Sequence, residues 1–412
     1  MASLRIRFAA LALALAAAAG ARAEPLHGRV ELTGRGEFAR SDSVDAALGE
    51  KDRAAVVGDL RLVWQPHAAG LDFDLQYELT AEAGGTVALA RDTSALGAPA
   101  PPATLFDLTS TLADDRRLIA TGHIDRLSVA WSSPDLVLKL GRQAITWGAG
   151  QVFHPMDLVD PFAPAQPDTE YKPGVDMAYA QVLFADGSDL QLIAVPRRPA
   201  AGRPVTADAS TFAAHYHRTA GALSLTGLAA RDHGDWTLGV GVGGPLAGAA
   251  WNVEIVPTIE PGGAVRTSAL ANISRGVTLF GRNATVLAEY YRNGFGVSGD
   301  RAIAALPADL AGRLARGQLF VTGRDALAGA VSLEVTPLVT LSPTIIADLD
   351  GPSLCVALQA QVSLSNEADL IAGVQAPVGA RGTAYGGRPL TGSGGPFVAA
   401  PTTVYILVRR HF

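Results

Sequence analysis

The sequence predicts an all-β fold, a closed antiparallel transmembrane β-barrel of about 18 strands, within a range of roughly 16–18. Three observations predict it: an export signal at the start, long segments in which apolar and polar side chains alternate, and an aromatic residue at the end. Only 17% of the 412 residues are charged and the formal charge is −6, whereas about a quarter are charged in an ordinary soluble domain.

The first residues have the pattern of a secretory signal. Arg5 and Arg7 precede an apolar run from Phe8 to Ala19, which is too short to span a bilayer. A small-x-small cleavage pattern ends at Ala23. We therefore expect residues 1–23 to be a signal peptide, and the expected barrel with long extracellular loops occupies residues 24–412.

The rest of the chain narrows the class further. The single cysteine, Cys355, allows no internal disulfide. No apolar run of about 18 residues follows the signal, so a membrane-spanning helix is not expected. An exported, apolar chain of this kind is either a large periplasmic protein or an outer-membrane barrel.

Alternation distinguishes these two classes. In 71–81, "LDFDLQYELTA", apolar residues hold the odd positions and polar ones the even positions. A tilted membrane-spanning strand needs about 9–11 residues, more than the usual sandwich strand. Pairing apolar with apolar residues across "PHAAG" predicts Trp64 opposite Leu71 and Arg61 opposite Asp74.

The same pattern recurs along the whole chain. The expected strands are 28–40, 55–65, 71–83, 122–132, 135–146, 174–185, 189–196, 210–219, 222–231, 236–243, 250–257, 264–273, 284–292, 326–336, 339–349, 353–364, 368–376 and 402–412. The connections alternate between a mostly short set and a set that holds every long one. Short periplasmic turns and long outside loops are typical of a barrel with both termini in the periplasm.

The final strand, "TTVYILVRRHF", carries a separate signal. Val404, Ile406 and Val408 share one face and the chain ends on Phe412. This strand resembles the C-terminal signature of bacterial outer-membrane proteins, although Arg410 stands where that pattern has an apolar residue. The resemblance implies that the barrel assembly machinery reads Phe412.

The segment 141–162, "GRQAITWGAGQVFHPMDLVDPF", falls at the end of one strand and the start of a long outside loop. Strict alternation would aim Arg142 at lipid, which costs roughly 2–4 kcal/mol at the bilayer midplane. We expect a β-bulge at Gly141 to turn Arg142 inward. The bulge would place Ile145 and Trp147 outward, with Trp147 in the aromatic girdle.

Residues 141–176 resemble the segment GRQ-xxx-WG-x-G-xx-FNP-x-D…PF…G-x-D of a poorly characterised Gram-negative outer-membrane barrel family, a porin-like domain of unknown function. His154 stands where Asn is expected. The match covers about 36 of 412 residues, and the rest matches as barrel architecture. The resemblance implies location and fold, and it implies work with an envelope efflux or lipid-transport system for some members.

Three roles are open for the loop 147–173. It could fold into the lumen and narrow it. Its carboxylates could bind a divalent cation, which prefers clustered oxygens; these are Asp157, Asp160, Asp168, Glu170 and Asp176. Its prolines and aspartates could also be ordinary turn chemistry in a structured loop. A short amphipathic helix is expected within 301–318, starting near Pro307.

Strand parity assigns candidate positions to the lumen and to the membrane interface. The lumen and constriction candidates are Asp59, Arg61, Asp72, Asp74, Gln76, Glu78, Arg142, Asp157 and Asp160. The girdle candidates are Trp64, Trp147 and Phe412. The wall formed by the first strands would be polar and net acidic, which favours cations and uncharged polar solutes.

These features favour a channel or export conduit in the outer membrane for a small solute or a hydrophobic molecule. The alternative is a non-conducting structural or partner-binding barrel of an envelope efflux or lipid-transport system. An enzyme is less favoured, because no hydrolase, zinc-protease, P-loop or haem-attachment motif is present. The expected partners are membrane lipid, lipopolysaccharide and the assembly machinery, with no nucleic acid, cofactor or metal.

Overall fold

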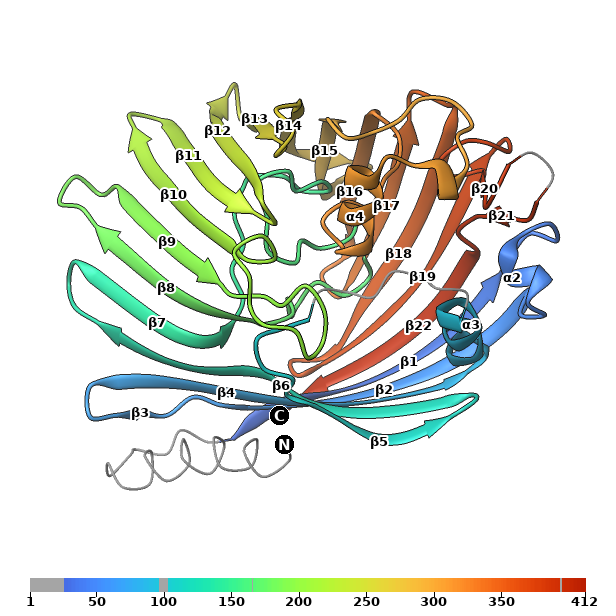
Figure 1. Cartoon of the computed structure of the whole chain (residues 1–412), viewed down its shortest axis with the longest axis horizontal. Helices are drawn as coiled ribbons and strands as arrows, with labels where there is room; N and C mark the ends of the chain where they lie inside the picture. The colour runs from blue at the N-terminus through green and yellow to red at the C-terminus, as the bar shows by residue number, and fades with distance from the viewer. Residues whose placement is uncertain (1–25, 96–102, 165, 393–394) are drawn as a thin grey trace.

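The structure is a computed structural model that describes residues 26–95, 103–164, 166–392 and 395–412 (Figure 1). The expected signal peptide, 1–23, lies outside the described residues. Among the residues that are described, no helix is long and apolar enough to cross a membrane.

One antiparallel sheet closes on itself to form the barrel, in the order β1, β2, β4, β6 to β19, β22 and back to β1. Eighteen strands make up this wall, as predicted. They are β1 His27–Phe38, β2 Asp52–Trp64, β4 Leu71–Gly84, β6 Leu118–Ser132, β7 Leu136–Gln143, β8 Val175–Leu183, β9 Asp189–Val195, β10 Thr211–Ala220, β11 Leu223–Asp232, β12 Asp235–Leu246, β13 Ala249–Ile259, β14 Val265–Leu279, β15 Arg282–Arg292, β16 Asp325–Thr336, β17 Val339–Asp348, β18 Ser353–Ser365, β19 Ala368–Gly379 and β22 Thr402–His411.

Smaller elements decorate the ends of this wall. They are α2 Val44–Ala47, β3 His67–Ala68, α3 Gly85–Ala95, β5 Thr109–Asp115, the 3-10 helix η1 Ile303–Ala305, α4 Ala308–Ala315, β20 Arg388–Pro389 and β21 Phe397–Val398. The predicted amphipathic helix is confirmed as α4, which begins directly after Pro307. Sequence alternation did not reveal α3 or β5, because both lie within the long connection 85–117.

The outer face of the wall is apolar. Alternate side chains on each strand point outward, and large aliphatic ones such as Leu32, Leu140 and Val240 are exposed there. Exposed apolar side chains all around a closed wall cost free energy in water and are favourable in lipid. The alternation in the sequence therefore reflects lipid outside and the lumen inside, and the transmembrane barrel is confirmed.

The connections fall into two sets, as predicted. The turns at the end of the barrel that carries both chain termini are short, and every long connection lies at the other end. The longest are 85–117, 144–174, 293–324 and 380–401. The two ends of the barrel therefore differ. We call the end with the short turns and both chain termini the trimmed rim, and the other end is covered by loops and by α4 (Figure 1).

The predicted register of the hairpin formed by β2 and β4 is wrong by four residues. Trp64 pairs with Leu75 and Arg61 with Glu78. The turn lies at Ala69 and Gly70, both with positive φ, as in a two-residue hairpin turn. The extra pairing of β3 moves the turn beyond Pro66, but the shift is even, so each side chain keeps its predicted face.

The first and last strands meet at a seam. β1 and β22 pair from Arg29 and His411 to Phe38 and Thr402, and Phe412 extends the pairing through backbone hydrogen bonds with Gly28. The terminal residue therefore completes the closure of the barrel. Inward positions of this seam include Arg29 and Arg409, which take part in the site described next.

Candidate functional site

The connection 144–174 between β7 and β8 enters the barrel and is held there by two buried glutamates. Glu289 of β15 accepts hydrogen bonds from three successive backbone N–H groups, those of Gln151, Val152 and Phe153, at 2.7–3.0 Å. Glu254 of β13 accepts another from Ala149. Hydrogen bonds to charged groups are the strong ones, and both carboxylates are buried. This loop is a fixed part of the lumen.

The first half of the loop packs against the wall through apolar and aromatic side chains. Trp147 stacks on His215 of β10, with ring centroids 5.1 Å apart, and donates from Nε1 to Gln191. Phe153 stacks on Tyr291, and Met156 is fully buried. We call residues 147–159 the base of the loop. It fills the side of the lumen formed by β9 to β17.

The expectation of an outward Trp147 is therefore wrong. Its side chain is 4% exposed and lies inside the barrel, and Ile145 packs against the same buried cluster. The register of β6, β7 and β8 runs without interruption through Gly141, so the expected bulge is also absent. Strand β7 ends at Gln143, earlier than predicted, so the chain turns inward there and parity no longer applies.

Arg142 is buried at the top of β7 and β8, where it binds Asp176 through two hydrogen bonds of 2.9 Å. It also donates to the backbone oxygen atoms of Ile124 and Phe106. Asp176 in turn accepts from the Phe106 N–H. The pair thus clamps residues 103–108 across the top of the short strands β7 and β8. This role is structural. Strand parity would point Arg142 toward lipid, and these contacts keep its charge away from lipid.

The second half of the loop reaches the seam of the barrel. Asp168 and Glu170 accept hydrogen bonds of 2.8 and 3.0 Å from Arg29 of β1. Both also pair with Arg409 of β22, and Glu170 lies 2.8 Å from His411. We call residues 168–171 the arm of the loop.

The loop therefore bridges nearly opposite walls. Counted around the ring, β13 lies eight pairings from β1 in one direction and ten in the other. Glu254 of β13 holds the base and Arg29 of β1 holds the arm. Of the three roles that the sequence left open for this loop, the structure favours a loop that enters the lumen.

A buried ion pair joins the base of the loop to the residues that precede β8. Lys172 Nζ lies 2.6 Å from Asp157 and also donates to the Ile145 carbonyl oxygen. Burial raises the pKa of Asp157 to about 6, and Lys172 opposes this shift. Burial also lowers the pKa of Lys172. Burial therefore disfavours the charged form of both groups, and the attraction between their charges offsets part of this cost.

The divalent-cation site, one of the three roles left open by the sequence, does not assemble from the five loop carboxylates. Asp157 pairs with Lys172, Asp176 with Arg142, and Asp168 and Glu170 with Arg29. For Asp160, burial raises the pKa, and the positive charges of Arg197 and Lys172 oppose this shift. The carboxylates are thus divided among separate protein cations.

The wall formed by β1, β2, β4 and β6 is lined by charges, as the lumen candidates predict. Arg61 is buried and pairs with Glu78 at 2.9 Å and with Asp125 at 2.6 Å. It also donates to Gln76. Asp59 pairs with Arg29 at 3.4 Å. The carboxylates of this wall are therefore neutralised by arginines that the strands themselves supply.

Two of the lumen candidates lie nearer the trimmed rim. Asp74 is half-buried and accepts a hydrogen bond from Gln76. Asp72 is exposed at the start of β4, where it pairs with His67. Neither residue contacts the loop through an ion pair among the described residues.

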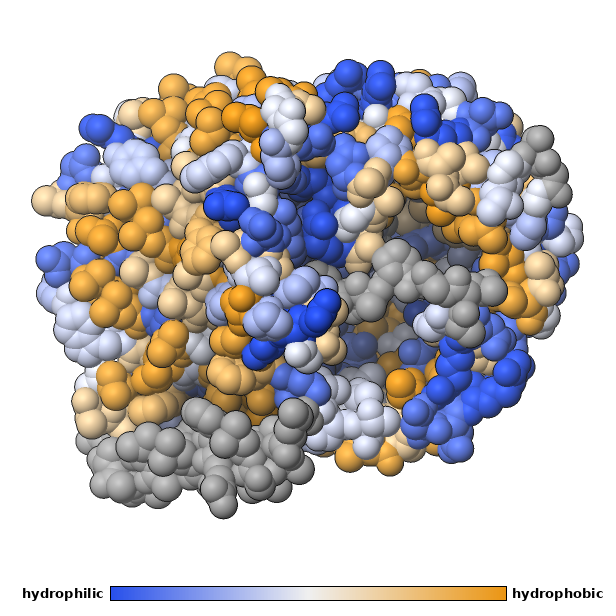
Figure 2. All heavy atoms as spheres, in the orientation of Figure 1, coloured by the Kyte–Doolittle hydropathy of each residue, from blue (hydrophilic) through white to orange (hydrophobic). Residues whose placement is uncertain are grey.

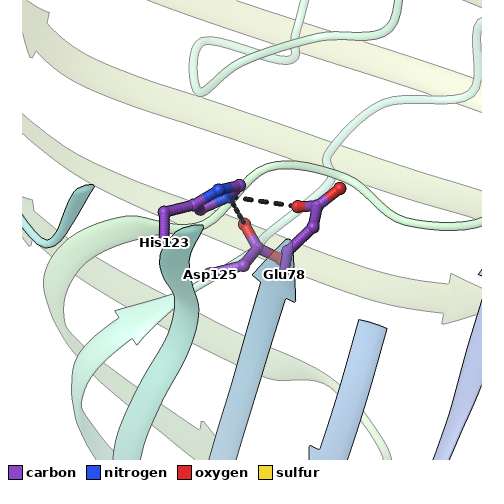
Figure 3. Close-up of side chains that lie close together, drawn as sticks. All are labelled: Glu78, His123 and Asp125. Carbon is purple, nitrogen blue, oxygen red and sulfur yellow. Dashed lines mark ion pairs between the residues drawn. The ribbon is translucent and has the colours of Figure 1, made fainter. Parts of the chain in front are cut away.

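Glu78, His123 and Asp125 point toward one another in the lumen (Figure 3). Their ligand atoms lie within 4.8 Å, as a metal site would require. However, Arg61 bonds both carboxylates, and Arg126 bonds Asp125 at 2.7 Å. These guanidinium groups already neutralise the two carboxylates that a metal ion would bind, so the cluster fits an ion-pair network better than a metal centre.

The remaining girdle candidates lie at the outer face. Phe412 is exposed at the trimmed rim, and Trp64 is half-buried on the outward face of β2. Other exposed aromatic side chains occupy the same face, among them Trp131, Phe212 and Trp236. Aromatic side chains at the outer face are typical of membrane interfaces.

Sequence reasoning missed the two glutamates that hold the loop. Glu254 and Glu289 lie in apolar contexts, "WNVEIV" and "VLAEYY", on strands rich in small residues. A lone inward acid in such a strand needs a partner, which is the signal that could have drawn attention to it. The partner itself is a run of backbone N–H groups in the loop between β7 and β8, and backbone groups leave no mark in the sequence.

Comparison with known proteins supports the fold. No family model matches the chain, and no curated protein matches it. The solved structure of Acinetobacter baumannii OccAB3 is similar over 93% of this chain and 99% of its own, with a TM-score of 0.53 and 10% identity. Pseudomonas aeruginosa OccD3 (OpdP) is similar over 96% and 93%, with a TM-score of 0.52 and 8% identity. At these identities the likeness shows the fold alone, and the resemblance of 141–176 stays a prediction.

Proposed function

We propose that this protein is a porin-like channel of the outer membrane that passes small polar solutes by diffusion. The inserted loop is the observation that carries the proposal. An 18-stranded barrel is wide enough to hold an aqueous bore. A loop anchored on both walls then sets the width and the lining of that bore (Figure 1).

The part of the lumen that the loop leaves open supports a polar solute. Towards the trimmed rim, a hollow of about 510 Å³ is lined by neutral side chains such as Thr278, Asn283, Thr285 and Ser332, with Glu334 among them. Figure 2 shows a recess in the molecule on the side of β19 and β22 (Figure 1). Hydroxyl and amide groups can replace the water of a polar solute as it passes.

The location follows from the same features. An apolar outer face requires a membrane, and the terminal Phe412 and the predicted signal peptide are typical of export to the outer membrane. In this proposal the partners are membrane lipid, lipopolysaccharide and, through Phe412, the barrel assembly machinery. The protein has no enzymatic role.

The test is conductance in planar lipid bilayers. The purified, folded full-length chain is expected to give discrete current steps in potassium chloride. The same protein after heat denaturation is the matched control and is expected to give none. A folded barrel that gives no current steps at any voltage would overturn the channel proposal.

The bridging loop also favours a second candidate, a non-conducting barrel that serves an envelope efflux or lipid-transport system. In that case the loop blocks the lumen and the exposed rim binds a partner. The bilayer experiment separates the two candidates. Chemical cross-linking in intact cells, with cysteines placed at the trimmed rim, would then identify a partner of the non-conducting form.

A further inference from the structure

The arm covers the arginines of the seam. The side chains of Arg29 and Arg409 are 5% and 14% exposed, whereas those of Asp168 and Glu170 are 23% and 30% exposed. The carboxylates therefore lie between the guanidinium groups and the water of the lumen. A solute at this point meets acidic groups before it meets basic ones.

The wall would be close to charge balance without the arm. Arg29 lies 3.5 Å from Glu31 and 3.4 Å from Asp59. Arg409 lies 3.3 Å from Asp369. The seam and the strands beside it, β2 and β19, thus supply two arginines and three carboxylates. The wall does not need Asp168 and Glu170 for neutrality, so these two residues supply most of the local acidic excess.

Tyr171 adds a second cover that carries no charge. Its ring lies 5.0 Å from the Arg29 guanidinium and 4.3 Å from that of Arg61. An aromatic face over a guanidinium satisfies the cation and hides its flat surface. Carboxylates bind the N–H edge of a guanidinium and aromatic rings stack on its flat face, and in this structure the arm occupies both.

The contact between the arm carboxylates and the arginines of the seam also affects the electrostatic field in the lumen. The carboxylates of the arm lie 2.8–3.4 Å from the guanidinium groups, without a water-filled gap between the two signs. Opposite charges in contact cancel at a distance, so the remaining field comes from the unbalanced carboxylates. This field attracts cations and repels anions within about 8–10 Å at physiological salt.

From these contacts we infer that Asp168 and Glu170 determine the charge selectivity of the constriction, which passes cations and uncharged polar solutes in preference to anions. This inference rests on the proposed channel function. It names the arm, rather than the strand residues of the wall, as the determinant. Removal of the arm charges is expected to weaken the preference of the constriction for cations.

The experiment measures the reversal potential of the full-length protein across a potassium chloride gradient. The natural protein is expected to shift toward the potassium equilibrium potential. Asp168→Asn/Glu170→Gln is expected to shift toward the chloride equilibrium potential. Tyr171→Leu, which changes no formal charge, is expected to move the potential the same way by a smaller amount.

Asp115→Asn/Glu367→Gln is the matched control. It removes the same formal charge from exposed positions at the two ends of the barrel. Its reversal potential should equal that of the natural protein. If Asp168→Asn/Glu170→Gln does not assemble, Glu170→Gln alone is measured, with half of the covering charge removed.

The outcomes separate the two claims. Current steps with an unchanged reversal potential in the arm variants would overturn the inference and leave the channel intact. Anion preference in the natural protein would overturn it too. A folded protein that passes no current would instead overturn the proposed function.

Discussion

The base and the arm of the inserted loop are held by different physics. The base is held by buried aromatic stacks and by backbone N–H groups that donate to Glu254 and Glu289. The arm is held by side-chain ion pairs to Arg29 and Arg409 that remain partly exposed to water. Buried packing and charged hydrogen bonds stabilise by several kcal/mol, whereas exposed ion pairs contribute about 0–1 kcal/mol each.

This difference implies separate roles. The base fixes the loop on one wall and reduces the bore permanently. The arm is held by pairs that face the water of the lumen, so it is the part that meets the solute. Substitutions in the base should therefore change mainly the stability of the inserted loop, and substitutions in the arm should change mainly conduction.

Loss of the Glu289 carboxylate should have the largest effect. Glu289→Ala leaves three N–H groups without an acceptor, and the two buried ones, of Val152 and Phe153, cost about 1–3 kcal/mol each. The base should detach, and single-channel conductance should rise with frequent fluctuations. Glu367→Ala, an exposed acid in the short turn between β18 and β19, is the control. Quiet, natural-sized current steps from Glu289→Ala would show that the glutamate does not hold the base.

Truncation of Trp147 should be next. Trp147→Ala removes the stack on His215 and the hydrogen bond to Gln191, a loss of about 3–5 kcal/mol for a large buried aromatic residue. The loop should become sensitive to protease while the barrel stays intact. Trp236→Ala, an exposed tryptophan on the outer face, should leave the loop resistant. Equal resistance in both variants would mean that the base does not depend on this packing.

Acidification should favour the inserted loop. The pKa of Asp157 is about 6 when the loop is inserted, against a usual value near 4 for an aspartate in water. Between these two pH values the inserted loop binds more protons than a released loop, so acid stabilises the inserted state. Burial raises the pKa of the neighbouring Asp160 in the same direction. Burial lowers the pKa of His154, which opposes the effect of the two carboxylates, and the lowered pKa of Lys172 acts in the alkaline range.

The number of loop-release events should therefore fall as the pH is lowered from about 7 to about 5. The measurement is the frequency of transient large-conductance events in bilayers. Asp157→Asn should respond less to pH than the natural protein. A response that is equally steep in Asp157→Asn would assign the pH dependence to another group.

The arm should show the smallest change in stability. Asp168→Asn/Glu170→Gln removes partly exposed ion pairs, so thermal unfolding of the barrel should shift little, by about 1 kcal/mol or less per pair. The thermal melt of the same variant is followed by circular dichroism. A destabilisation as large as that of Trp147→Ala would show that base and arm are not different in kind.

The sequence reveals the wall of this molecule far better than its interior. Every predicted strand matches a strand of the wall, because lipid outside and water inside impose a period of two on each. The predicted register of the hairpin formed by β2 and β4 is wrong, because the turn at Ala69 and Gly70 sets the register. Trp147 was misplaced because parity ends where β7 ends.

The site itself depends on contacts that no local pattern contains. Asp168 and Glu170 were recognised as notable acids, but their partners Arg29 and Arg409 lie more than a hundred residues away at either end of the chain. Loop insertion was one of three roles that the sequence left open. What decides among them is Glu254 and Glu289, whose partners are backbone groups and therefore have no residue signature.

The most direct test of the account is the single-channel conductance of a chain without the inserted loop. Gln143 and Val175 are directly paired on neighbouring strands, so a short Gly-Ser turn can replace residues 144–174 without strain on the wall. If the loop sets the bore, the shortened barrel should conduct several times more current than the natural protein and should lose most of its charge selectivity. Equal conductance and selectivity in the two proteins would contradict the account.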